Sequence, residues 1–122
     1  MDTFTRLSIV LSSTSLVILV YFSIAAQVNG QTVFPVEFRN QADVTIYVTD
    51  FPNRADLLVY RVEYASQPRG NEGRWFFTEF ATQAKKKIFF TRYRNRAQLT
   101  IHFVDYPNQA RWRNSSKKHL MY

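Results

Sequence analysis

Short runs of apolar residues, some alternating with polar ones, recur along this chain and are typical of β-strands. In the first run, Val44, Ile46 and Val48 fall on one face of an extended segment and are separated by residues of the other face. The later runs at 57–63 and 99–105 are rich in β-branched and aromatic residues, which favour strands. No 3.6-residue period accompanies them, so the pattern excludes a helical domain.

A common phrase introduces these runs: an aromatic residue, a spacer, Asn, a spacer and Ala. Its copies, of which the third and fourth are weaker, begin at Phe38, Phe51, Tyr64, Phe80, Tyr93 and Tyr106. The intervals are 13 residues, except for 16 residues between the third and fourth copies. A fixed period indicates one structural unit used repeatedly, here a strand of about seven residues and a tight connection. We therefore predict an all-β repeat domain of about six units, with one short helical turn at 81–87 as an option.

Aligning the units shows which side chains are expected to share an environment. One column holds Ile46, Val59, Trp75, Ile88 and Ile101, and the next holds Tyr47, Tyr60, Phe76, Phe89 and His102. In the connections, Pro52 presets φ for a turn, and Asn53 is a residue that bonds its own backbone or accepts a positive φ.

The third unit carries extra residues at 69–73, the Gly-rich part of the chain after residue 30. Two glycines and an asparagine in five residues indicate a loop with positive φ angles. A plain insertion is one interpretation, and a ligand-binding loop is the other.

Residues 1–30 have the pattern of a secretory signal peptide. Arg6 gives a weak positive start, 7–26 carries no charge, and small residues follow. Cleavage is expected after Gly30, with Ala26 as a second option. The alternative is an uncleaved N-terminal membrane anchor, because the uncharged stretch approaches the roughly 20 residues that span a bilayer. We therefore assign 1–30 to a signal peptide and 31–122 to one secreted, extracellular domain.

The 92 residues from 31 to 122 contain no cysteine, so packing rather than disulfides must stabilise the domain. Nine Phe, six Tyr and two Trp provide the apolar material. Asn114-Ser115-Ser116 is a candidate N-glycosylation site.

Charge is distributed unevenly along the chain. Residues 31–80 hold five arginines against seven acids, whereas 81–122 hold ten lysines and arginines against one acid. The alternation of Arg92, Arg94 and Arg96 would point all three to one side of an extended segment. The interleaved Tyr93 and Trp112 are suited to stacking on sugars or bases.

These residues predict a polyanion-binding face. The candidate set is Lys85, Lys86, Lys87, Arg92, Arg94, Arg96, Arg111, Arg113, Lys117 and Lys118. In a secreted protein the expected partners are sulfated glycans or other anionic surfaces, and the compartment argues against nucleic acid. The alternative is that the charge keeps an aromatic-rich domain soluble.

Nothing in the sequence favours an enzyme, and we predict no catalytic residue, metal site or cofactor. No His, Cys, Asp or Glu cluster has metal-ligand spacing. His102 and His119 would form a phosphodiester-hydrolase pair only if the fold brought them together. His102 instead occupies a column of Tyr and Phe, which favours a packed position.

Four acids share the repeat position before an aromatic residue. They are Asp50, Glu63, Glu79 and Asp105. We expect them to accept hydrogen bonds from the following turn or to pair with arginines, rather than to form a carboxylate ring.

Several ordered motifs make the chain resemble the septoil-knot domain family. They are the Asn-Gln-Ala repeats, 55–60, 69–71, 75–77, 83–88 and the tail 112–120. The resemblance covers about 33–122 and implies a strand-rich domain whose backbone forms a deep seven-crossing torus knot, a rarity among folds. With such a path, Trp112 is expected to anchor the last threaded segment and Lys117-Lys118 to keep its end solvated. The resemblance implies no enzymatic activity, and no functional residues carry over.

The sequence therefore predicts a secreted, non-enzymatic and kinetically stable module with a structural or interaction role. Polyanion binding through the basic face is the alternative.

Overall fold

Short strands alternate with 3₁₀ turns in the computed structural model, which describes residues 30–68 and 71–122. The predicted signal peptide lies outside the described residues, apart from Gly30. The strands are β1 (Gln31–Pro35), β2 (Val44–Val48), β3 (Leu57–Val62), β4 (Arg74–Phe77), β5 (Lys86–Phe90), β6 (Leu99–Phe103) and β7 (Arg111–Trp112). In this part of the chain, no helix has the length and apolar character needed to cross a membrane.

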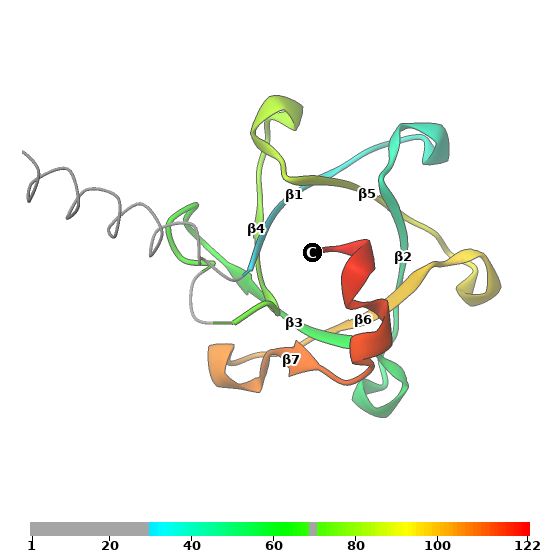
Figure 1. Ribbon diagram of the computed structural model, residues 1–122, viewed down its shortest axis with the longest axis vertical. Helices are drawn as coiled ribbons and strands as arrows, with labels where there is room; N and C mark the ends of the chain where they lie inside the picture. Colours follow the sequence, from blue (N-terminus) through cyan, green and yellow to red (C-terminus); the bar gives the residue numbers. More distant parts are fainter. Residues whose placement is uncertain (1–29, 69–70) are drawn as a thin grey trace, which may run out of the picture.

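Six of the strands close into a parallel barrel. The order around the ring is β1, β5, β2, β6, β3 and β4, and β4 also pairs with β1, which closes the ring. β7 adds to β3 as the antiparallel strand of the sheet. Figure 1 looks down this ring. The structure thus confirms the all-β prediction.

The two halves of the chain interleave within the ring. β5 lies between β1 and β2, and β6 lies between β2 and β3. Most neighbouring strands are therefore far apart in sequence, as the pairing of Val33 with Lys86 illustrates. This arrangement is compatible with a knotted path, and the knot itself stays a prediction.

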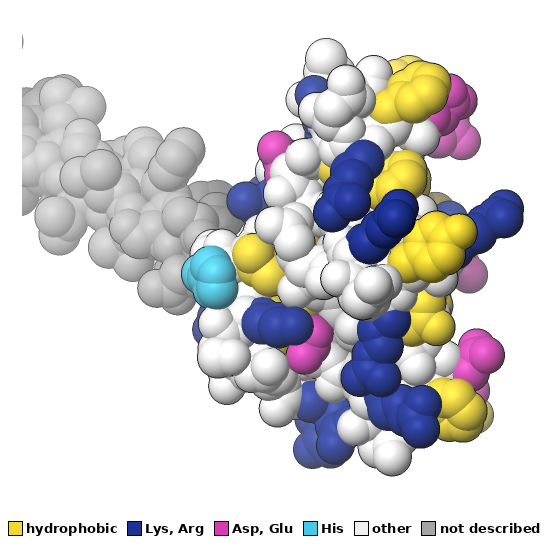
Figure 2. All heavy atoms as spheres, turned by 90° about the vertical axis from the view of Figure 1, so that its right-hand side faces the viewer, with side chains coloured by type: hydrophobic (Ala, Val, Ile, Leu, Met, Phe, Trp, Pro, Cys, Tyr) yellow, Lys and Arg dark blue, Asp and Glu magenta, His cyan; other side chains and the backbone are white. Residues whose placement is uncertain are grey.

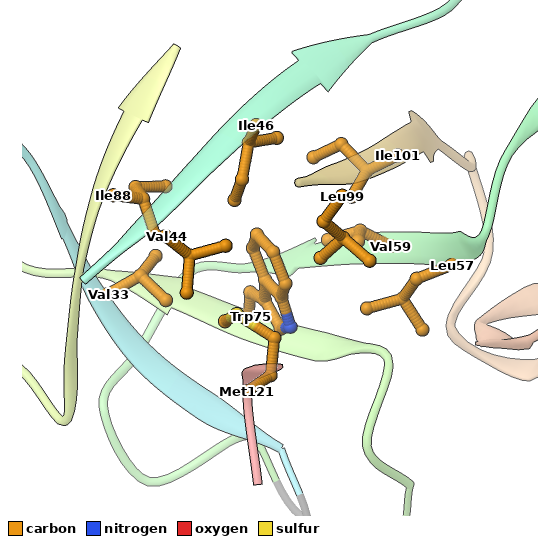
Figure 3. Close-up of a cluster of buried hydrophobic side chains, with 10 residues drawn as sticks. All are labelled: Val33, Val44, Ile46, Leu57, Val59, Trp75, Ile88, Leu99, Ile101 and Met121. Atoms are coloured by element: carbon orange, nitrogen blue, oxygen red, sulfur yellow. The ribbon is translucent and has the colours of Figure 1, made fainter. Parts of the chain in front are cut away.

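The first repeat column forms the inside of the barrel. All five of its members, Ile46, Val59, Trp75, Ile88 and Ile101, are fully buried. Figure 3 shows the Trp75 indole near the middle of the cluster, with aliphatic side chains from other strands directed toward it. One strand per unit contributes to one shared core, as repeat architecture requires.

The alternation predicted for 44–48 is wrong at two positions, one near the start of the strand and one at its end. Val48 is 38% exposed, whereas Thr45 is buried. Val48 ends β2, where the chain leaves the ring for the next turn. Thr45 is covered from outside, because its N–H donates to the Gln98 side chain and its carbonyl accepts the Gln98 N–H.

Each repeated phrase forms an outward connection, which we call a corner: the leading aromatic residue and the turn that follows it. Five corners contain the 3₁₀ turns η1 (Arg39–Gln41), η2 (Pro52–Arg54), η3 (Ala81–Gln83), η4 (Arg94–Arg96) and η5 (Pro107–Gln109). The sixth is a turn closed by the Gln67 N–H and the Tyr64 carbonyl. The helical turn allowed at 81–87 is thus η3, and the same turn recurs at other corners.

A threonine fixes three of these corners. The hydroxyls of Thr49, Thr78 and Thr91 each accept the N–H of the aromatic residue two positions later, at 3.2 Å. Across the described residues, the four acids predicted for this role make no such bond. Short side-chain-to-backbone bonds of this kind stabilise a turn without a positive φ. No described non-glycine residue has a positive φ, so Asn53 does not use that option.

Of the loop predicted at 69–73, residues 69–70 lie outside the described residues, so among its glycines a positive φ is tested only at Gly73. There the glycine is required by close packing rather than by a positive φ. A Cβ there would lie 2.5 Å from the Leu58 carbonyl oxygen and 2.9 Å from the Ala110 Cβ. The Gly73 carbonyl in turn accepts the Tyr60 N–H at 2.9 Å. The glycine therefore lets β3, β4 and the start of β7 approach one another.

The C-terminal tail covers one opening of the ring. The turn η6 (Ser115–Leu120) lies across the opening in Figure 1, and Met121 is fully buried beneath Trp75 in Figure 3. The Gln31 side-chain amide donates to the Met121 carbonyl, which ties the tail to β1. The tail is thus part of the core.

We expect Met121→Ala to lower the free energy of unfolding by about 2–5 kcal/mol, because it removes a side chain that closes the core. Equilibrium denaturation would measure this loss. Tyr64→Ala, at a corner residue that is 63% exposed, is the control and should cost under about 0.5 kcal/mol. Equal stability of the Met121→Ala variant and the parent chain would contradict the assignment of the tail to the core.

We also expect the domain to unfold slowly, with an unfolding rate in water below about 10⁻³ s⁻¹. The reason is that β5 and β6 are each held on both sides by strands from the other half of the chain, so separating them disrupts the whole ring. Stopped-flow and manual-mixing fluorescence in guanidinium would measure the rate. Complete unfolding within seconds and without hysteresis would contradict kinetic stability.

Candidate anionic-ligand surface

The basic residues predicted from the sequence do not form one patch. Arg92, Arg94 and Arg96 lie at the η4 corner, and the lysines 85–87 lie at the start of β5. Arg111 and Arg113 belong to β7 and its end, whereas Lys117 and Lys118 belong to η6. The site must therefore be assembled from positions around the ring.

Ring order places the η4 corner between those of η1 and η2. Each corner follows its own strand, and β5 lies between β1 and β2. Figure 1 shows the same succession of outward turns. The Arg39 guanidinium confirms the contact, because its Nη2 donates to the Arg96 carbonyl at 3.0 Å.

A hollow of about 400 Å³ lies between the η1 and η4 corners. Its walls include Arg39, Arg92 and Arg96 together with Tyr93 and Phe90. No carboxylate occurs among the described residues that line it. Three arginines and aromatic residues thus line this hollow, and no lining carboxylate balances their charge.

Arg92 adds to this charge by replacing an acid. The position before the leading aromatic residue is acidic at the other five corners, which have Glu37, Asp50, Glu63, Glu79 and Asp105. At η4 it is arginine. The hollow therefore gains a cation where the repeat otherwise provides an anion.

Two corner arginines stack on their own aromatic residue. The guanidinium of Arg96 lies 5.0 Å from the Tyr93 ring centre, and that of Arg54 lies 4.9 Å from the Phe51 ring centre. The extended conformation predicted for 92–96 is wrong, because residues 94–96 form a 3₁₀ turn that allows this return contact. Stacking limits the guanidinium's freedom and leaves its N–H edge available to an anion.

We call the five arginines of the η1, η4 and η2 corners the basic face: Arg39, Arg54, Arg92, Arg94 and Arg96. Figure 2 views this side of the barrel, where Lys and Arg side chains form a column beside hydrophobic ones. The leading aromatics of the six corners are 55–63% exposed. Basic and aromatic groups thus share this surface.

Sequence reasoning missed Arg39 and Arg54, because both lie in the half of the chain with net negative charge. The repeat alignment contains a signal for them. Arg39 occupies the same position as Arg94, and Arg54 occupies the same position as Arg96. What the alignment lacks is the ring order that brings these corners together.

The lysines 85–87 lie beside β1. Lys86 is half-buried, whereas Lys85 and Lys87 are exposed. The backbone N–H of Lys87 donates to the Asp43 carboxylate at 2.8 Å, and that of Lys85 donates to the Thr32 carbonyl. These bonds hold the backbone of the lysines between β1 and the segment that leads from η1 into β2.

Arg111 and Arg113 lie near the η2 corner. The Arg113 guanidinium donates to the Pro52 carbonyl at 2.6 Å. Arg111 lines a second hollow, of about 450 Å³, together with Pro52, His102, Asp105 and Asn108. The basic surface therefore continues past η2.

Lys117 and Lys118 have acidic partners. The Lys117 Nζ lies 3.1 Å from Oδ2 of Asp56, and the Lys118 Nζ lies 2.6 Å from Oε1 of Glu72. Glu72 also accepts the indole N–H of Trp112 at 2.8 Å. This bond agrees with the expected anchoring role of Trp112. The two lysines were expected only to keep the end of the chain solvated, and their ion pairs also hold the tail against the barrel.

Asn114 caps η6 and is half-buried. Its side-chain oxygen accepts the Ser116 N–H at 3.3 Å, and its Nδ2 donates to Asp56 at 3.3 Å. Glycosylation at Asn114 stays a prediction. The bond to Asp56 places the candidate acceptor nitrogen against the barrel.

The two histidines have separate backbone partners. Nδ1 of His102 lies 2.8 Å from the Thr49 carbonyl, and Nδ1 of His119 lies 3.0 Å from the Ser116 carbonyl. Only His102 lines the second hollow. Within 30–68 and 71–122, no group of three or more His, Cys, Asp or Glu residues is arranged to hold a metal ion.

The interleaved barrel and its repeated corners define a small all-β structural domain. The 7(1) septoil knot domain family matches residues 30–113, so the chain belongs to that family. The match includes β1 to β7 and ends before η6. No curated protein and no solved structure was found to match the chain.

The environment of Tyr122, the last residue of the tail, leads us to expect a loss of stability at high pH. Burial raises the pKa of the Tyr122 hydroxyl above its usual value, and the Glu72 carboxylate raises that pKa further. The hydroxyl donates to the Glu72 backbone carbonyl in its neutral form. Because the folded pKa exceeds the unfolded value of about 10, the folded state holds this proton more tightly.

Stability from this group should therefore be complete below about pH 10 and fall as the pH rises above it. Thermal unfolding at pH 8 to 11 would measure the effect, with Tyr122→Phe as the matched variant. We expect a flatter pH dependence for Tyr122→Phe. Identical pH profiles for the two proteins would contradict the role of the hydroxyl.

Proposed function

We propose that this protein is a secreted, non-enzymatic domain that binds anionic polysaccharides, sulfated glycans above all, through the basic face. The observation that carries the proposal is the hollow between η1 and η4, where Arg39, Arg92 and Arg96 meet without a lining carboxylate. Positive charges that line one hollow repel one another, and a bound anion offsets that repulsion. Their forked N–H groups match the oxygens of sulfate and carboxylate.

The exposed aromatics favour a sugar polymer over a simple anion. Tyr93 and Phe51 present rings beside stacked arginines. A ring can pack against the C–H face of a sugar while the neighbouring arginine binds its charged substituent. This combination suits a chain of charged sugars that crosses several corners.

The barrel suits this function because it holds the corners rigidly. The η1, η4 and η2 corners each begin and end in a strand that the ring bonds on both sides. Loops on a rigid scaffold bind with a smaller ordering cost. Kinetic stability would also protect the domain among extracellular proteases, so the structural and the binding roles are compatible.

The compartment supports glycans rather than nucleic acid. The signal-peptide pattern of 1–30, which lies outside the described residues except for Gly30, is the basis for secretion. Extracellular matrices and cell surfaces present sulfated polysaccharides. Nucleic-acid binding is therefore an outcome for the experiment to exclude.

Retention on immobilised heparin across a salt series tests the proposal. The test variant combines Arg39→Gln, Arg92→Gln and Arg96→Gln, and the control combines Lys85→Gln, Lys117→Gln and Lys118→Gln. Both lose three charges, so their net charges are equal. We expect the test variant to bind soluble heparin at least about tenfold more weakly than the control, which corresponds to about 1.4 kcal/mol.

Equal losses in the two variants would contradict a defined site and indicate only diffuse charge. Preference for single-stranded DNA over heparin at matched salt would contradict the glycan assignment. Thermal unfolding of both variants shows whether each retains the fold.

A further inference from the structure

The second hollow differs chemically from the first. It lies between the η2 and η5 corners, and its wall includes one cation, Arg111, and one anion, Asp105. The amides of Asn108 and Gln109 also line it. Its polar groups therefore offer both hydrogen-bond donors and acceptors, with no excess of positive charge.

His102 provides a further polar group in a position that is otherwise aromatic. The equivalent residues in other units are Tyr47, Tyr60, Phe76 and Phe89. Its Nδ1 lies 2.8 Å from the Thr49 carbonyl, and a carbonyl can only accept, so Nδ1 carries the proton. In the neutral ring this leaves Nε2 as an acceptor, and the bond to Thr49 fixes the orientation of the ring.

Apolar groups complete the lining. Leu58, Phe103 and Val104 contribute, and Pro52 lies at the edge shared with the η2 corner. An apolar wall with convergent polar groups is the general form of a small-ligand site. The volume of about 450 Å³ is in the range of ligand-sized clefts.

We propose that this hollow binds a hexuronic acid unit, that is, a sugar residue with one carboxylate and several hydroxyls. The Arg111 guanidinium binds the carboxylate. Asp105 and His102 Nε2 accept hydroxyl protons, and Asn108 provides both a donor and an acceptor. The Asp105 carboxylate repels a second negative charge on the same unit, so the hollow suits a sugar with one carboxylate and free hydroxyls rather than one that also carries a sulfate.

This inference rests on the proposed polysaccharide binding and names one component of the ligand. The two hollows lie on successive corners of the ring: the first lies between η1 and η4, and the second lies between η2, the next corner, and η5. A polymer with both sulfate groups and uronate units can therefore contact both.

Three oligosaccharide probes separate the two sites. The first is an unsulfated oligomer of hexuronic acid, and the second is the same oligomer with its carboxylates reduced to alcohols. The third is dextran sulfate, which has sulfate groups but no uronate. Calorimetry measures affinity, and the NMR shift of the His102 ring C–H reports contact at the second hollow.

The variants are chosen from residues that the repeat already accommodates. Arg111→Gln introduces the residue found at the equivalent Gln98, and His102→Phe introduces that found at Phe89. Lys85→Gln, at the same repeat position in the η3 unit, is the matched control. We expect each hollow variant to bind the uronate oligomer about three- to tenfold more weakly, with Lys85→Gln unchanged.

We also expect the reduced oligomer to bind the parent protein at least about tenfold more weakly than the uronate oligomer, which corresponds to about 1.4 kcal/mol. Equal affinity for the two would overturn the uronate assignment. If the protein binds dextran sulfate but not the uronate oligomer, and the combined Arg39→Gln, Arg92→Gln and Arg96→Gln variant loses that binding, this inference is overturned and the proposed function is left intact. Binding of neither polymer would overturn both.

Discussion

Closure of the ring is the constraint on which this structure depends. β4 bonds to both β1 and β3, so no strand among the six has a free edge. Strands of four to six residues bury little on their own, and an open parallel sheet would leave two rows of unpaired backbone groups. Because the second half of the chain fills the gaps left by the first, neither half can bury its apolar column alone. Stability is therefore collective, and it is reached without disulfides.

The same closure leaves the corners free to differ. The turn does not require one residue type at the first or the third position after the leading aromatic residue. The first position is arginine at 39 and 94 but proline at 52 and 107. The third position is arginine at 54 and 96 but glutamine at other corners. The backbone turn is nevertheless the same at η1, η2, η4 and η5. Charge can thus change at a corner with little effect on the ring. Interleaving then converts charges that are distant in sequence into one surface, as the Arg39–Arg96 contact shows.

Periodicity was sufficient to predict the strands that follow the corners, the residues that share the inner column, and the corners themselves, but not β1, which precedes the first copy of the phrase. The column from Ile46 to Ile101 is the barrel interior, because a repeat places equivalent residues in equivalent environments. Periodicity could not predict the ring order, since pairing of β1 with β5 depends on contacts between distant segments. For that reason Arg39 and Arg54 were missed, and the alternation of Arg92, Arg94 and Arg96 was misinterpreted. Val48 and Gly73 were misjudged for a related reason, because their environments are set by where the chain leaves the ring and how closely β3 and β7 approach.

In the proposed mode of binding, the two hollows act together because they lie on successive corners of the ring. Each is open and of moderate size, so a single sugar in either would be held weakly. A polymer bound in this way at the η1–η4 hollow would raise the effective concentration of its next units at η2, where Arg54 lies and where Arg113 donates to Pro52. From there the path reaches Arg111 and His102. The rigid ring keeps these positions at fixed separations. If the proposed binding holds, the spacing of charged groups along the polymer, rather than the affinity of one site, would therefore determine which polymer binds best.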